Sequence, residues 1–235
     1  MSWLPGVHIA PNIQDDPGLY EIENRALDPD GLLLAAMADL APWADRVAVD
    51  LGAGAGFWVP HLATTARHVF AVEPHGPSRI LAMKRLSEAG IANASVLVGS
   101  AEQTFLAADS VDVVHARFAY FWGAGCEHGL AEVARILKPG GSLLVIDNDL
   151  ERGTFAEWLT SLPPPYGRDG AAIDAFWAAA GFSCARVLSR WSFGSREELE
   201  AVARLEFREH ADRLIAGHVG LDISYGYKVF YRQYS

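Results

Sequence analysis

The sequence predicts an α/β protein with a doubly wound, mainly parallel sheet, and three observations lead to this fold class. From Arg46 onward, short runs rich in β-branched residues alternate with longer helical patterns, as in parallel strands joined by crossover helices. Each short run is almost continuously apolar, which is typical of strands buried on both faces. The first run leads into the alternating glycines of VDLGAGAGFW, a turn expected between a strand and a helix.

The elements of the first half follow in order along the chain. Strands are predicted over 46–51, 68–73, 94–99, 111–116 and 142–147. Between them we expect helices over 57–65, 78–89 and 127–137, with a short turn at 101–105. The last of these helices should end at Lys-Pro-Gly-Gly, because proline cannot continue a helix and glycine favours its C-terminus.

The alternation of short strands and crossover helices ends after Asp147. Helices are predicted over 154–161, 173–180 and 195–213, and strands over 183–191 and 224–234, with a stiff triple-proline connection at 163–165. The alternating tyrosines of the final strand are typical of a sheet edge or of an antiparallel insertion. The charged helix over 195–213 is interpreted as a solvated face, with a dimer contact as the alternative. We expect one domain over 43–235, preceded by an N-terminal helical extension over 1–42 with helices near 19–26 and 31–40.

Composition excludes several classes of function. The chain has 235 residues, is 51% hydrophobic and carries a formal charge of −10. A surface this acidic repels nucleic acid and anionic membranes, so neither is an expected partner. No secretory leader and no membrane span are recognisable, which predicts a cytoplasmic protein. Cys126 and Cys184 match no metal spacing and are interpreted as buried free thiols rather than one disulfide, and no metal site is expected.

The glycine turn predicts a nucleoside site. Gly52, Gly54 and Gly56 let a ligand approach the backbone at the start of a helix, where unpaired N–H groups point outward. Glu73 ends the second strand, where a carboxylate can accept both ribose hydroxyls. Asp50 precedes the turn and would repel a pyrophosphate but attract an ammonium or sulfonium group. This favours a cationic nucleoside with an amino-acid tail over a nicotinamide dinucleotide.

Five spaced motifs over about residues 45–150 resemble those of class I S-adenosylmethionine-dependent methyltransferases: DLGAGAG, FAVE, GSAE, VDVVHAR and ILKPGGSLLVID. The resemblance implies a Rossmann-like seven-stranded sheet with an antiparallel last strand, an N-terminal helical lid, and S-adenosylmethionine as cofactor. Many relatives carry Asp where Ser100 stands. The residues that the resemblance assigns to the cofactor are Asp50, Gly52, Ala53, Gly54, Gly56, Glu73, Ser100, Ala101, Glu102, Ala116 and Phe118.

Methyl transfer from a sulfonium needs positioning and the exclusion of water more than covalent help. The candidate catalytic residues are Tyr20, which would lie on the lid or else pack with Ile22 against the sheet, Arg117, and Asp149. Arg117 is expected to pair with Glu21, Glu23 or a substrate anion, and Asp149 is a candidate base or substrate anchor, or else a helix cap. A substrate pocket is expected from Tyr120, Phe121, Trp122 and Asn148.

Two neighbouring residues are expected to be structural. His115 is interpreted as a hydrogen-bonded core histidine, and Trp58 as a packing residue. The aromatic residues after the fourth strand suggest a planar or hydrophobic acceptor.

The predicted function is S-adenosylmethionine-dependent methyl transfer to a small molecule. The Asn/Asp-Pro-Pro-Tyr turn of base-amino methyltransferases is missing, since this chain has Arg-Phe-Ala-Tyr at 117–120. Two alternatives stay open. One is a protein of this fold that binds the cofactor without methylating, because a fold does not fix chemistry. The other is a nicotinamide-dependent oxidoreductase, which shares the glycine turn and Glu73. The oligomeric state is left open.

Overall fold

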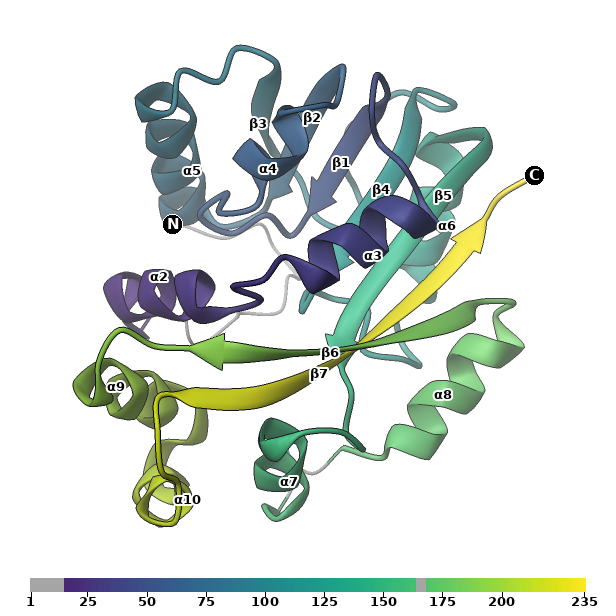
Figure 1. The fold of residues 1–235 in the computed structure, drawn as a ribbon. Helices are drawn as coiled ribbons and strands as arrows, with labels where there is room; N and C mark the ends of the chain where they lie inside the picture. The colour runs from purple at the N-terminus through teal and green to yellow at the C-terminus, as the bar shows by residue number, and fades with distance from the viewer. Residues whose placement is uncertain (1–14, 164–167) are drawn as a thin grey trace.

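A seven-stranded sheet runs through the molecule in the order β3-β2-β1-β4-β5-β7-β6 (Figure 1). The structure is a computed structural model, and it describes residues 15–163 and 168–235. Strand β7 runs antiparallel to both of its neighbours, and all other neighbouring strands are parallel. The predicted sheet with an antiparallel last strand is therefore confirmed. The strands are β1 (Val47–Leu51), β2 (His68–Glu73), β3 (Ala94–Val98), β4 (Val111–Arg117), β5 (Leu137–Asn148), β6 (Ser183–Ser192) and β7 (Asp222–Gln233).

Helices cover both faces of the sheet, as a doubly wound fold requires. One core cluster joins the sheet to α3, α4, α7, α9 and α10, and the other joins its opposite face to α6 and α8. The described helices are α2 (Pro17–Ala26), α3 (Leu32–Leu40), α4 (Val59–Ala63), α5 (Gly76–Glu88), α6 (Glu127–Ile136), α7 (Thr154–Thr160), α8 (Gly170–Ala179), α9 (Arg196–Phe207), the 3₁₀ turn η1 (Arg208–His210) and α10 (Ala211–Ala216).

The N-terminal extension is tied to the far edge of the sheet. Asp28 is buried, and its carboxylate accepts hydrogen bonds from Leu33 N at 2.9 Å and from the Ser189 hydroxyl on β6 at 2.7 Å. One bond satisfies the start of α3 and the other anchors it to β6. Asp16 caps α2 in the same way, through the N–H groups of Gly18 and Leu19. Both predicted helices of the extension are confirmed, and residues 1–14 lie outside the described residues.

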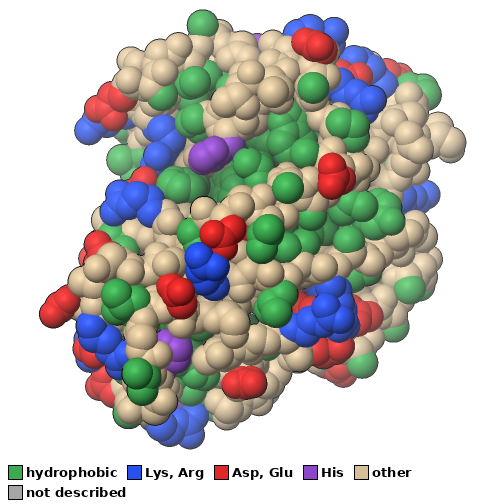
Figure 2. Space-filling model, in the orientation of Figure 1, with side chains coloured by type: hydrophobic (Ala, Val, Ile, Leu, Met, Phe, Trp, Pro, Cys, Tyr) green, Lys and Arg blue, Asp and Glu red, His purple; other side chains and the backbone are tan. Residues whose placement is uncertain are grey.

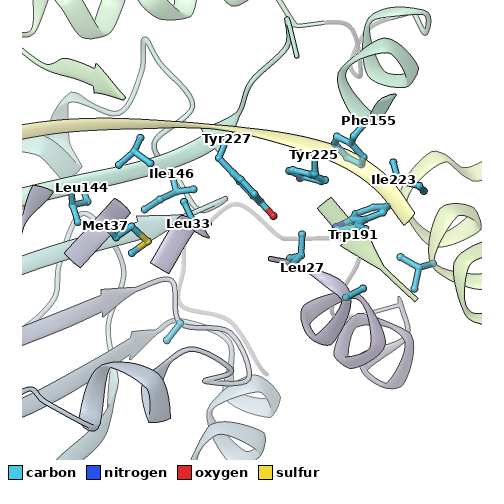
Figure 3. Packing of buried hydrophobic residues seen from close by; sticks show 14 of the residues in the cluster. Leu27, Leu33, Met37, Leu144, Ile146, Phe155, Trp191, Ile223, Tyr225 and Tyr227 are labelled. Carbon is cyan, nitrogen blue, oxygen red and sulfur yellow. The ribbon is translucent and has the colours of Figure 1, made fainter. Parts of the chain in front are cut away.

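An aromatic cluster packs where β6 and β7 project past the other strands (Figures 1 and 3). Tyr225 stacks on Phe155 with ring centroids 4.1 Å apart, and it lies 5.3 Å from Trp191 and 4.6 Å from Tyr227. Tyr225 and Tyr227 share this face because side chains two apart on a strand point the same way. β7 lies between β5 and β6, so the final strand is an antiparallel insertion and not a sheet edge.

Two predicted elements differ from the structure by more than the others, and the first is β5. β5 begins at Leu137, directly after α6, because Lys-Pro-Gly-Gly forms a bulge inside the strand and not a separate loop. Val111 pairs with Leu137 but Val113 already pairs with Ser142, and Gly140 takes the positive φ of 82° that the bulge needs.

The single helix predicted over 195–213 is wrong. Helix α9 ends at Phe207, because Arg208 adopts a positive φ of 51° and turns the chain into η1 and α10. The turn keeps Phe207, Ala211 and Ile215 buried in one core cluster. Part of the charged face is solvated, since Arg196, Glu200 and Arg204 form surface ion pairs.

The two cysteines are free thiols, as predicted, but only Cys126 is buried, because Cys184 lies exposed on the edge strand β6. Within residues 15–163 and 168–235 no group of side chains could hold a metal ion, and no helix is long and apolar enough to cross a membrane. Two of the three prolines predicted to stiffen the connection lie outside the described residues.

Candidate active site

The glycine turn after β1 has the geometry that the sequence predicts. Gly52, Gly54 and Gly56 have positive φ angles of 76°, 55° and 69°, which residues with a Cβ rarely adopt. A Cβ on Gly52 would lie 2.5 Å from Cβ of Ala119, so the turn passes directly against the segment after β4. The N–H groups of Gly52 and Ala53 donate to the carbonyl of Val72 on β2. The turn is therefore held rigidly at the carboxyl ends of the central strands.

Glu73 is fixed beside this turn by two backbone donors. Its Oε2 accepts from Gly54 N at 2.8 Å, and its Oε1 accepts from His75 N at 2.7 Å. Burial raises the pKa of Glu73, while these two N–H groups and Arg79 lower it. A carboxylate oxygen has two lone pairs, so each oxygen keeps one acceptor site after its backbone bond. Two acceptor sites side by side are what the two hydroxyls of a ribose require.

Asp50 and His115 are register partners on β1 and β4, with His115 Nδ1 3.5 Å from Asp50 Oδ1. His115 is fully buried, as predicted. Neither ring nitrogen has a hydrogen-bond partner within residues 15–163 and 168–235, so the prediction of a hydrogen-bonded histidine is wrong. Burial lowers the pKa of His115 to about 4, although Asp50 acts in the opposite direction, and the ring is neutral at pH 7. Oδ2 of Asp50 also lacks a hydrogen-bond partner among the described residues. An orphaned buried carboxylate oxygen favours a cationic ligand here.

Arg117 ends β4 and stacks on Trp58, with the guanidinium carbon 4.1 Å from the ring centroid. Its Nε is buried without a hydrogen-bond partner, and it forms no ion pair within the part of the chain that the structure describes. The predicted pairing with Glu21 or Glu23 is therefore wrong, and Glu21 pairs with Arg85 instead. Burial lowers the pKa of Arg117 to about 10, which leaves it a cation at neutral pH. Trp58 is buried, as expected.

The turns after β3 and β4 are both closed by local hydrogen bonds. Ser100 and Gln103 exchange backbone N–H and carbonyl groups at 2.9 and 3.2 Å. Glu102 accepts a hydrogen bond from the Tyr120 hydroxyl at 2.9 Å, which joins the two turns. Ala101 and Ala116 are buried. Phe118 adopts a positive φ of 50° and lies with its ring 6.2 Å from that of Tyr227.

The aromatic run after β4 does not form one wall. Phe121 is 1% exposed and belongs to the core cluster that contains α6, whereas Trp122 is 42% exposed with the guanidinium of Arg168 5.0 Å from its ring. Of the four predicted pocket residues, Asn148 alone meets the β7 tyrosines, because its side-chain oxygen accepts from the Tyr225 hydroxyl. Phe121 and Trp122 therefore lie in different environments, and the geometry does not support the aromatic pocket wall predicted over residues 120–122.

Asp149 has the contacts of a structural residue. Its Oδ1 accepts from Glu151 N at 3.0 Å, and its Oδ2 lies 3.7 Å from Arg186 Nε and 3.9 Å from Arg152 Nε. It therefore caps the turn that precedes α7 and is neutralised by two cations. Gly153, and not Asp149, is the N-cap of α7. The geometry does not favour the role of a base that the sequence suggests for Asp149.

Helix α2 carries Tyr20 to the same edge. The charges of Glu23, Glu206, Arg117 and Glu73 all act on the Tyr20 hydroxyl, and burial is the main cause that raises its pKa. Tyr20 thus lies between the ends of β2 and β4 on one side and α9 on the other. Around α3 and α4, on the face shown in Figure 2, hydrophobic side chains gather at the surface. The extension and α4 enclose the edge where Asp50, Glu73 and Arg117 meet.

Sequence reasoning missed a pair of carboxyl groups between α2 and α9. Glu23 on α2 is 8% exposed and donates a hydrogen bond to Glu206 on α9. Burial raises the pKa of both groups, that of Glu206 to about 7, although the hydrogen bond and Arg208 act in the opposite direction on Glu206. Glu206 is half-buried on α9, and its carboxyl group faces Glu23. No pattern in the charged helix distinguishes this glutamate, whereas the spacing of Tyr225 and Tyr227 does mark them as neighbours.

The raised pKa of Glu206 makes stability depend on pH. Its folded value of about 7 exceeds the ordinary 4.5, so its stabilising contribution is complete below pH 4.5 and is lost as pH rises through 7. We expect the free energy of unfolding to fall by on the order of 1–2 kcal/mol between pH 5 and 8. Glu206→Gln should remove this loss, so the variant should be more stable than the native chain at pH 8.

Urea unfolding at pH 5, 6, 7 and 8 measures this difference. Glu209→Gln is the matched control, because Glu209 is exposed three residues further along the chain. Parallel pH profiles for the native chain and Glu206→Gln would contradict the pairing of Glu206 with Glu23.

Comparison with known proteins agrees with this geometry. A family model described as a methyltransferase domain matches residues 49–145. An uncharacterised methyltransferase of Mycobacterium tuberculosis is 33% identical over 156 residues, which cover 66% of this chain and 59% of the relative. A ubiquinone/menaquinone biosynthesis C-methyltransferase of Rubrivivax gelatinosus is 36% identical over 119 residues, or 51% of this chain and 44% of that protein.

The fold has solved counterparts. The crystal structure of an S-adenosylmethionine-dependent methyltransferase from Aquifex aeolicus superposes with a TM-score of 0.57 at 19% identity, covering 90% of this chain and 97% of that one. The chain spans 59% of the length of the mycobacterial relative. The five motifs, the strand order and the matched domain all indicate a methyltransferase. The chain therefore contains a methyltransferase domain and has the fold of the class I S-adenosylmethionine-dependent methyltransferases.

Proposed function

We propose that the protein transfers a methyl group from S-adenosylmethionine to a small-molecule acceptor. The observation that carries this proposal is the fixed carboxylate of Glu73 beside the glycine turn and the orphaned oxygen of Asp50. Together they offer acceptor sites for a ribose and a negative group for a cation, on a backbone that a ligand can approach. A nicotinamide dinucleotide would bring its pyrophosphate toward Asp50, which is unfavourable.

The residues present fit both charges of an amino-acid tail. Asp50 provides a carboxylate for the ammonium group, and Arg117, whose Nε has no hydrogen-bond partner among the described residues, provides a cation for the carboxylate. Glu73 takes the ribose, and the turn from Gly52 to Gly56 lies under the tail. Ser100, Ala101 and Glu102 border the adenine, and Ala116 and Phe118 border the tail. When bound, S-adenosylmethionine supplies a methyl group on a positively charged sulfur.

The chain's own contribution is positioning and the exclusion of water. α2 and α3 are anchored to β6 through Asp28, so the residues over 15–42 act as a lid that holds Tyr20 over the site. The acidic charge of the chain supports a small acceptor over nucleic acid. A small-molecule substrate also agrees with a cytoplasmic location.

Calorimetric titration with S-adenosylmethionine, S-adenosylhomocysteine and NADH tests the proposal. We expect micromolar binding of the first two and none of NADH. Release of S-adenosylhomocysteine in the presence of small-molecule acceptors then separates an active enzyme from a protein that only binds the cofactor. If NADH alone bound, the oxidoreductase alternative would replace the proposal.

Arg117→Met tests the assignment of the amino-acid tail. Methionine keeps the apolar stem over Trp58 but removes the cation, so the dissociation constant for S-adenosylhomocysteine should rise about 10- to 100-fold. Adenosine, which lacks the tail, should bind both proteins equally. Arg67→Met is the control, since Arg67 is exposed at the start of β2. An equal loss for adenosine would show that Arg117 shapes the whole site and does not hold the tail.

A further inference from the structure

Arg85 on α5 joins three segments that meet at the glycine turn. Its Nε donates a hydrogen bond to the carbonyl of Ala55 at 3.0 Å, and its Nη2 donates to the carboxylate of Glu21 on α2. The guanidinium carbon lies 5.3 Å from the ring centroid of Phe57, which follows the turn. Its two hydrogen-bond partners lie 30 and 64 positions away in the sequence. One side chain therefore links the turn, the aromatic ring after it and the lid.

Helix α5 supports the glycine turn along one face. A Cβ on Gly56 would lie 3.0 Å from the Cβ of Ala82, so the helix and the turn approach closely. Arg79 donates a hydrogen bond to the carbonyl of Glu73 at 2.8 Å. Residues 79, 82 and 85 are three apart, and residues at this spacing are neighbours on a helix surface. Arg85 therefore extends from a helix whose position relative to the turn is fixed.

Helix α2 lies between two supports. Glu21 and Glu23 are two residues apart, so they lie about 200° apart around the helix. Glu23 faces α9, whereas Glu21 faces α5, and Figure 1 shows α2 directly below α5. α2 also packs against β6, the edge of the sheet farthest from β2 and β3, which α5 covers. The ion pair between Glu21 and Arg85 therefore links the lid to the side of the site that carries the glycine turn.

These contacts use the shape of arginine as well as its charge. A guanidinium is planar, carries several N–H donors on its edge, and keeps its faces free to stack on an aromatic ring. A lysine ammonium is a compact point charge that lacks both the fork of donors and the stacking face. The side chains of Arg85 and Glu21 are 26% and 27% exposed, so solvent screens this pair less than it screens a fully exposed one.

We propose that Arg85 is a positioning residue of the cofactor site, which holds the glycine turn in place and fastens α2 over the bound ligand. This inference rests on the proposed function, because the turn is where S-adenosylmethionine would bind. The bond to Ala55 acts on the backbone under the ligand, and the pair with Glu21 acts on the helix that carries Tyr20 over it. Release of S-adenosylhomocysteine then requires the pair to open, so the pair sets how long this product stays bound.

The experiment measures the rate at which S-adenosylhomocysteine leaves the protein. Stopped-flow displacement gives this rate for the native chain, Arg85→Met, Arg85→Lys, Glu21→Gln and the double variant that combines Glu21→Gln with Arg85→Met. Arg25→Met is the matched control, because Arg25 lies 4.0 Å from the same glutamate but its side chain is 59% exposed. Hydrogen exchange of the α2 amides, in protein without ligand, reports on the lid independently of binding.

We expect Arg85→Met to raise the dissociation rate about 10- to 100-fold, and Glu21→Gln about three- to tenfold, because Glu21→Gln leaves the bond to Ala55 intact. The double variant should match Arg85→Met, since both substitutions break the same pair. Arg85→Lys should stay closer to Arg85→Met than to the native chain. High salt should speed release from the native chain but not from Glu21→Gln, because salt screens an ion pair. The α2 amides should exchange faster in Arg85→Met and Glu21→Gln, and Arg25→Met should behave as the native chain.

Two outcomes would overturn the inference alone, in protein that does bind S-adenosylhomocysteine. One is a pair of rate increases for Glu21→Gln and Arg85→Met that multiply in the double variant, which would mean that the two residues act separately. The other is native exchange of the α2 amides in both single variants. A native chain that bound no S-adenosylhomocysteine would overturn the proposed function and this inference with it.

Discussion

Replacing Glu73 by alanine is expected to weaken the binding of S-adenosylhomocysteine at least a hundredfold. The substitution removes both free acceptor sites of the carboxylate, and each charge-assisted hydrogen bond contributes about 1.5–3 kcal/mol. It also leaves the N–H groups of Gly54 and His75 without their acceptors, so the glycine turn loses its connection to the end of β2. The lost acceptor sites and the released glycine turn both weaken the binding of S-adenosylhomocysteine. Calorimetry at 25 °C measures the change.

Glu73→Gln separates the charge from the shape of the side chain. Glutamine keeps one acceptor oxygen, but its amide nitrogen is a donor. That nitrogen cannot accept the N–H group that it faces, which is either that of Gly54 or that of His75. We therefore expect Glu73→Gln to lose more than tenfold in affinity although its size is unchanged. Glu88→Ala is the control on the exposed end of α5. A dissociation constant within threefold of the native value for Glu73→Ala, in a protein with native circular dichroism, would contradict the ribose assignment.

Much of the fold was predictable because its determinants are local. The buried strands appear as apolar runs, and β2 was predicted with the bounds that the structure has. The glycine turn was predictable because a positive φ and a close approach both exclude a Cβ, which leaves a trace in the sequence. No comparable sequence pattern indicates the break in the helix at Arg208. A non-glycine residue takes this conformation there because Phe207, Ala211 and Ile215 must all reach the core, which is a tertiary requirement.

The candidate site was predictable only where its residues lie at the ends of neighbouring parallel strands. Asp50 and the turn lie at the end of β1 and Glu73 ends β2, so their meeting point follows from the topology. The pairing of Asp50 with His115 depends on the register between β1 and β4, and the pairing of Glu23 with Glu206 depends on how α2 packs against α9. A charged helix contains several glutamates, and the packing of α2 against α9 decides which of them meets Glu23. Arg117 was recognised as unusual, but its stacking on Trp58 required the structure.

The second large effect is expected for Gly52→Ala. A side chain at the φ of 76° costs about 1–3 kcal/mol in strain, and its Cβ would lie 2.5 Å from Cβ of Ala119. The neighbour cannot yield easily, because Ala119 lies one residue from Phe118 and Tyr120, which themselves have positive φ angles. The turn must move instead. We expect a loss of about 3 kcal/mol or more in the free energy of unfolding.

Gly90→Ala isolates the strain from the clash. Gly90 follows α5 with a φ of 65°, but a Cβ there would meet nothing within 4 Å. Its substitution should therefore cost about 1–2 kcal/mol and leave the affinity for S-adenosylhomocysteine unchanged. Gly52→Ala should lose both stability and affinity, since the turn that moves is the one under the ligand. If the two variants lost equal stability and both still bound S-adenosylhomocysteine, the close contact with Ala119 would have no role, and the alternating glycines would serve the backbone conformation alone.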